Sequence, residues 1–147
     1  MPRPILVLFL LVGALLIAPA SFSAEPWDQV RISELASKLA DEVKAIDKLM
    51  TRSQLGNQQR RDFFRLRETV RRIRNETKRL ASLLDGGAGH DETVPVFEQL
   101  GLQVRNAREI SRRMMTTSDL QQKFDAARAV LDEIAPYYDV APRQPSL

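Results

Sequence analysis

The chain has 147 residues, with 22 Lys and Arg against 19 Asp and Glu, one histidine and no cysteine. Without a thiol there is no disulfide framework, no lipid attachment through cysteine and no covalent c-type haem. The net charge of +3 is small, so the composition does not indicate a nucleic-acid-binding protein, although the pI is near 9.6.

Residues 1–24 have the pattern of a secretory signal peptide. Arg3 supplies the positive start, Ile5 to Ile17 is an uncharged apolar run, and small residues suited to cleavage follow. The run is shorter than the ~20 apolar residues that a bilayer-spanning helix needs. We therefore expect a cleaved signal, at Ser23/Ala24 or slightly earlier, rather than a membrane anchor. The expected location of the mature protein is periplasmic or secreted.

The remaining chain shows helical periodicity in four consecutive segments. Apolar side chains recur at three-four spacing, which places them on one stripe of each helix. The four stripes are Ile32, Leu35, Leu39, Val43, Ile46, Met50; Phe63, Leu66, Val70, Ile73, Thr77, Leu80, Leu84; Phe97, Leu100, Val104, Ala107, Ser111, Met114; and Leu120, Phe124, Ala127, Leu131, Ile134, Tyr138.

The breaks between the stripes have the residues of helix ends. Glu25-Pro26 suits a first turn, Gly56-Asn57 can end one helix and cap the next, and residues 85–90 form a glycine-rich loop that holds His90. Asp91 or Thr93 can cap the third helix, with Pro95 in its first turn. A capping box begins the fourth helix at Ser118.

Such short joints place consecutive helices side by side. The sequence therefore predicts an all-α fold: an antiparallel up-down-up-down four-helix bundle over residues 25–139, followed by a disordered tail over residues 140–147. A three-helix arrangement and a swapped dimer are the competing architectures. The expected oligomeric state is a monomer or a homodimer.

The second helix is strongly basic. Residues 60–79 contain nine Lys and Arg against three Asp and Glu. Arg60, Arg67 and Arg74 recur along one flank, where they can pair with acids of a neighbouring helix. A face whose arginines are all paired in this way would be solvated surface and no more.

A second basic series lies on the outer face of the same helix, where arginine can dock an acidic protein or another anionic surface. Phe64 lies one position off the apolar stripe, beside Phe63. The partner is an unidentified protein or an anionic surface, and not nucleic acid. The candidate partner-binding residues are Arg61, Arg65, Arg71, Arg72, Lys78 and Arg79.

We find no pattern of catalytic, metal or cofactor residues, and expect no enzyme, no metal and no cofactor. Di-metal bundles need Glu-x-x-His pairs, which are absent. The architecture resembles b-type four-helix cytochromes, but the last helix has no histidine. Met50, Met114 and Met115 are more simply core residues. Trp27 and Tyr137-Tyr138 are expected to meet at one bundle end, as an aromatic plug or as the wall of a pocket.

The segment from Leu55 to Arg60 (LGNQQR) opens the basic helix and resembles the Leu-Thr-x-x-Gln motif of periplasmic stress chaperones and sensors related to Spy and CpxP. The resemblance covers six residues, with Gly56 in place of threonine. It implies a dimeric cradle that shields unfolded clients on a basic, apolar concave surface.

We therefore expect a non-enzymatic periplasmic interaction or accessory module that acts through its second helix. A chaperone or stress sensor is the first alternative, and a bundle that binds a small ligand, haem or a metal is the second.

Overall fold

The structure, a computed structural model, describes residues 25–52, 60–114 and 116–139. Within these residues all regular structure is helical and no strand is present, which confirms the predicted all-α fold with four helices. The predictions of a signal peptide, of a joint at Gly56-Asn57 and of a C-terminal tail lie outside the described residues. The elements are α1 Gln29–Arg52, α2 Arg60–Asp85, α3 His90–Ser111, α4 Ser118–Ile134 and the short 3-10 helix η2 Ala135–Tyr138.

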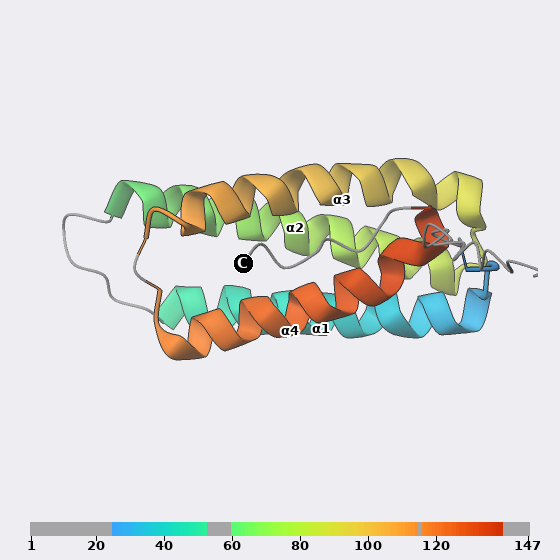
Figure 1. The fold of residues 1–147 in the computed structure, drawn as a ribbon, viewed down its shortest axis with the longest axis horizontal. Coiled ribbons are helices and arrows are strands. Elements are labelled where there is room, and N and C mark those ends of the chain that lie inside the picture. The colour runs from blue at the N-terminus through green and yellow to red at the C-terminus, as the bar shows by residue number, and fades with distance from the viewer. Residues whose placement is uncertain (1–24, 53–59, 115, 140–147) are drawn as a thin grey trace, which may run out of the picture.

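The four helices lie side by side along the long axis of the molecule (Figure 1). α1 packs against both α2 and α4, and α2 also packs against α3. The predicted stripes of α1 and α2 are buried along their whole length. Thr77, the polar member of the α2 stripe, donates its hydroxyl to the Arg74 carbonyl at 3.0 Å, so its burial leaves no unpaired donor.

The stripes of α3 and α4 are buried less completely. Leu100 and Ile134 are fully buried, whereas Val104, Phe124 and Leu131 are only half-buried. The sequence pattern did not distinguish these two groups, because both obey the three-four spacing. The half-buried residues lie on the sides of α3 and α4 that face each other.

Ion pairs join α1 to both of its neighbours. Arg74 of α2 meets Asp47 of α1 at 2.6 Å, as the flank prediction for the basic helix requires. Lys123 of α4 meets Glu42 of α1 at 3.1 Å, and Arg31 meets Glu133 at 3.0 Å. Since most of these side chains are partly exposed, the pairs orient the helices more than they stabilise them.

The start of α1 differs from the prediction. The helix begins at Gln29 rather than at Glu25-Pro26. The carboxylate of Asp28 accepts a hydrogen bond from the Arg31 N–H at 3.0 Å, so Asp28 supplies the cap that proline cannot.

The starts of α3 and α4 also lie earlier than predicted. α3 begins at His90, where Glu92 accepts from the Gly89 N–H at 3.0 Å, and Pro95 consequently lies inside the helix rather than in its first turn. Thr117, not Ser118, caps α4 by accepting from the Leu120 N–H at 3.4 Å.

The ends of α3 and α4 come sooner than their stripes suggest. α3 ends at Ser111, so Met114 packs on the core from outside the helix. α4 ends at Ile134, and the chain continues as η2 because Pro136 has no N–H to donate. Asp139 follows with a left-handed φ of 55°. No helix in the described ranges is both long and apolar enough to cross a membrane.

Candidate functional site

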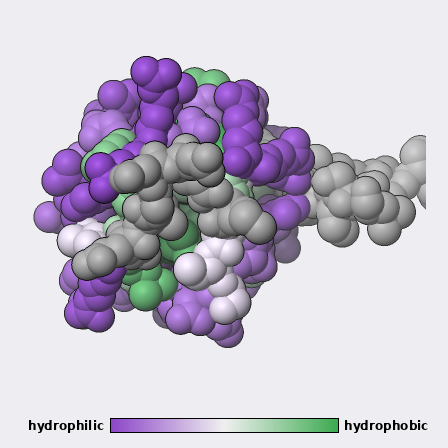
Figure 2. All heavy atoms as spheres, turned by 90° about the vertical axis from the view of Figure 1, so that its left-hand side faces the viewer, coloured by the Kyte–Doolittle hydropathy of each residue, from purple (hydrophilic) through white to green (hydrophobic). Residues whose placement is uncertain are grey.

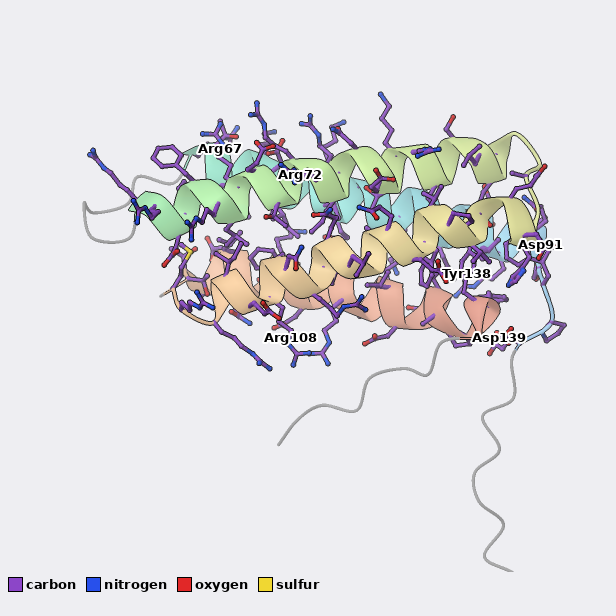
Figure 3. The ribbon with its side chains drawn as sticks, turned by 90° about the horizontal axis from the view of Figure 1, so that it is seen from above. Arg67, Arg72, Asp91, Arg108, Tyr138 and Asp139 are labelled. Atoms are coloured by element: carbon purple, nitrogen blue, oxygen red, sulfur yellow. The ribbon has the colours of Figure 1, made fainter. Side chains whose placement is uncertain are left out.

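The first candidate site is the outer surface of α2, here called the α2 basic face. It comprises Arg61, Arg65, Arg71, Arg72, Lys78 and Arg79, and all six side chains are exposed. The apolar stripe of α2 faces the core, so residues offset from it by half a turn point outward. Figure 3 shows basic side chains projecting from α2, with Arg72 labelled.

The structure separates this face from the basic flank of the same helix. Arg74 on the flank is held by Asp47 of α1, and Arg67 beside it is half-buried. On the face, Arg72 meets Glu68 at 3.5 Å, but both side chains are more than half exposed. An exposed pair of this kind is worth about 0.3–0.5 kcal/mol, which does not fix Arg72 in place.

Phe64 adds an apolar group to the α2 basic face. Its side chain is 59% exposed, and its ring meets Phe63 edge-on, with 6.3 Å between the centroids. Phe63 is buried, so the pair anchors an exposed aromatic ring next to Arg61 and Arg65 along the helix. The structure thus assigns Phe64 to the surface rather than to a wider core.

The second candidate site, here called the α3–α4 groove, is a cavity of about 770 Å³ between α3 and α4. Its floor is formed by core residues of α1 and α2, among them Val43 and Val70. These floor residues are at most a few per cent exposed, so they also belong to the packed core of the bundle. Its apolar walls include Phe97, Gly101, Val104, Phe124, Ala127 and Leu131.

The rim of the groove is charged. Arg105, Arg108 and Arg112 line it from α3, and Arg128 lines it from α4. Three carboxylates lie among them, at Glu98, Asp125 and Asp132, and Arg128 meets Asp132 at 3.7 Å. Figure 2, which views the bundle from the end where α1 stops and α2 starts, shows hydrophilic side chains around most of the outline and hydrophobic ones between them.

Sequence reasoning missed this groove. The signal was present in α3, where arginines and Gly101 occupy the positions next to the apolar stripe on the side that faces α4. On that side Phe97 and Val104 share the groove wall with Gly101 and the arginines.

The end of the groove at Phe97 meets a cluster of aromatic rings. Tyr138 stacks on Phe97 with 4.2 Å between centroids and on His90 with 5.6 Å. Trp27 packs edge-on against Tyr138 at 5.6 Å and against His90 at 5.5 Å. The predicted contact of Trp27 with Tyr138 is confirmed. The four rings pack against one another, and this cluster is here called the aromatic plug.

His90 belongs to this plug. The prediction that it lies in the glycine-rich loop is wrong, because it is the first residue of α3. The Tyr138 hydroxyl donates to Thr93 Oγ1 at 2.8 Å. Burial raises the pKa of Tyr138 above its ordinary value, and the hydrogen bond with Thr93 opposes that shift. The arrangement holds the rings of Trp27, His90, Phe97 and Tyr138 together.

Side chains that could hold a metal ion do not cluster in the described residues. No group of three or more His, Asp or Glu side chains is placed to hold a metal ion in the part of the chain that the structure describes. Met50 is 1% exposed and packs within the core. Met114 is partly buried and packs against the same core. The side chain of Met115 lies outside the described residues.

Comparisons with protein-family models, with curated proteins and with solved structures find no match to this chain. The two candidate sites are therefore judged on their own geometry.

Proposed function

We propose that this chain is a non-enzymatic accessory protein of the periplasm or the secreted fraction, which docks an acidic protein partner through the α2 basic face. The observation that carries the proposal is the exposure of all six predicted basic side chains on one side of one helix. The signal-like composition of residues 1–24 supports the location. An antiparallel up-down-up-down bundle provides the rigid support.

The buried stripe of α2 favours a protein partner over a membrane surface. A helix that lies on a membrane inserts its apolar face between the head groups. The apolar face of α2 is committed to the core from Phe63 to Leu84, which leaves Phe64 as the apolar group on its exposed side. Exposed arginines beside an aromatic ring are typical of protein interfaces, where Arg and aromatic residues are enriched.

A photo-crosslinking amino acid at Asn75 tests the proposal. Asn75 is exposed and lies within the α2 basic face. We expect one saturable crosslinked protein, which disappears when Arg65, Arg72 and Arg79 are replaced by Gln. The matched control places the same crosslinker at Asp41, an exposed position on the outer side of α1. Equal labelling from both positions, or labelling that survives the triple substitution, would refute the proposal.

A second candidate function, the binding of a small ligand, is favoured by one observation. The α3–α4 groove has about 770 Å³, within the ~300–1,000 Å³ of small-molecule sites. Its apolar floor and charged rim also fit the usual composition of such sites.

A further inference from the structure

The bundle is closed on three sides and open on the fourth. α1 packs against α2 and α4, and α2 packs against α3, whereas α3 and α4 enclose the groove between them. Val104, Phe124 and Leu131 remain half-buried on its walls. Apolar side chains left partly in water on both walls gain free energy when an apolar occupant covers them.

The rim charges and Gly101 explain why this side stays open. Arg105 and Arg112 of α3 and Asp125, Arg128 and Asp132 of α4 line the groove, and such charged side chains keep their heads in water instead of closing the contact between the two helices. Gly101 contributes no side chain to the wall, and a Cβ added there would meet no atom within 4 Å. Gly101 therefore leaves open space at its own position on the α3 wall.

The shape of the groove suits a single acyl chain better than a helix. An α-helix with its side chains is ~10 Å across, so a stretch of it about 22 Å long would occupy roughly 1,700 Å³, more than the about 770 Å³ of this groove. The α3 wall runs from Phe97 to Arg112, a length of about 22 Å at ~1.5 Å per residue. One leaflet of a bilayer core, and hence one acyl chain, spans about 15 Å. One acyl chain therefore fits within the length of the α3 wall.

The charges along the groove give the occupant a direction. Arg105, Arg108 and Arg112 line the end near the α3 C-terminus, although Asp125 lies at the same level on α4. Glu98 and Asp132 lie toward the other end, next to Phe97 and Leu131. An anionic head is favoured at the arginine end and disfavoured at the acidic end.

We propose that the α3–α4 groove binds one long-chain fatty acid, with its carboxylate at Arg105 and Arg112 and its methyl end against Phe97. The site is independent of the α2 basic face, because none of the six residues of that face lines the groove. A protein with Arg65, Arg72 and Arg79 replaced by Gln therefore keeps its fatty-acid binding, so that the two proposals fail separately.

The first test uses the unaltered protein and displacement of a fluorescent polyene fatty acid by hexadecanoate. We expect one site per chain, and hexadecanol, which lacks the carboxylate, to bind at least about tenfold more weakly. The double variant Arg105→Gln with Arg112→Gln removes that preference. Arg113→Gln, which changes an exposed arginine outside the groove, preserves it.

A groove-filling variant gives the second test. Gly101→Phe places a ring in the open space and lowers hexadecanoate affinity by at least about tenfold, while Gly101→Ala leaves most of the groove free and binds within about threefold of the original. Absence of hexadecanoate binding to the unaltered protein, equal binding of hexadecanol, or full binding by a folded Gly101→Phe protein would overturn the proposal. So would tight binding of an acidic amphipathic peptide at the groove in place of the fatty acid.

Discussion

Replacing Gly101 by Ala should stabilise the protein, and the structure allows the size of the effect to be worked out. Gly101 lies inside α3, where glycine costs about 0.5–1 kcal/mol relative to alanine because its unfolded backbone is more flexible. A Cβ at this position meets nothing within 4 Å, so the substitution brings neither a clash nor a new contact. The expected gain is therefore the backbone term alone, about 0.5–1 kcal/mol.

Thermal and urea unfolding of the two proteins measure this gain. For a domain of this size, it corresponds to a rise in Tm of about 2–6 °C, with an unchanged urea m-value. Gly87→Ala is the matched control, because Gly87 has a φ of +86° that alanine rarely adopts, and it should be destabilised instead. A fall in Tm for Gly101→Ala would show that α3 and α4 close over this position, and the open groove would then be wrong.

Three other predictions concern Tyr138, the ion pair of Asp47 with Arg74 and the chaperone alternative. Tyr138→Phe loses the hydrogen bond to Thr93 and should cost about 0.5–1.5 kcal/mol by urea unfolding. Because the folded pKa of Tyr138 is raised, its contribution to stability is complete below the unfolded pKa and lost as pH rises through the folded one; Tyr138→Phe should therefore lose less stability in alkali than the unaltered protein, and equal losses would contradict this. Asp47→Asn breaks the pair with Arg74 and should cost about 0.5–1 kcal/mol, whereas Asp41→Asn, at an exposed position, should cost almost nothing. The chaperone alternative predicts that the purified protein suppresses aggregation of an unfolded client at stoichiometric amounts, and our account expects no suppression in a light-scattering assay.

Helix periodicity carried most of the fold prediction. The stripes of α1 and α2 are buried throughout, because two packed neighbours cover each of these helices and the apolar pattern must match them. Even the polar Thr77 belongs to the stripe, since its hydroxyl is satisfied within its own helix. The outward placement of Arg65, Arg72 and Arg79 followed from the same periodicity.

The local ends of the helices were harder to predict, because several nearby residues can cap equally well. The sequence predicted a first turn at Glu25-Pro26 and a capping box from Ser118, whereas Asp28 caps α1 and Thr117 caps α4. The position of His90 was also mispredicted. Its aromatic contacts with Trp27 and Tyr138 join residues far apart in the sequence, so the glycine-rich sequence around His90 could not reveal them.

The α3–α4 groove could not be read from one helix at a time. It arises because weakly apolar sides of α3 and α4 meet each other, with Gly101 and rim arginines where larger apolar side chains would close the contact. The stripe through Val104 and Leu131 has correct spacing and is still only half-buried. Which helices are neighbours, and on which sides, is information that periodicity does not contain.

The most direct test of the central claim uses the partner protein that the Asn75 crosslinker captures. Its affinity is measured for two triple variants of this chain that lose the same charge. One replaces Arg65, Arg72 and Arg79 by Gln on the α2 basic face, and the other replaces the exposed Lys38, Lys44 and Lys48 of α1 by Gln. We predict that the first weakens binding by about 10- to 100-fold with no fall in Tm, and that the second changes it less than about threefold. Equal weakening by both variants, or a large loss of stability in the first, would contradict a docking role for the α2 basic face.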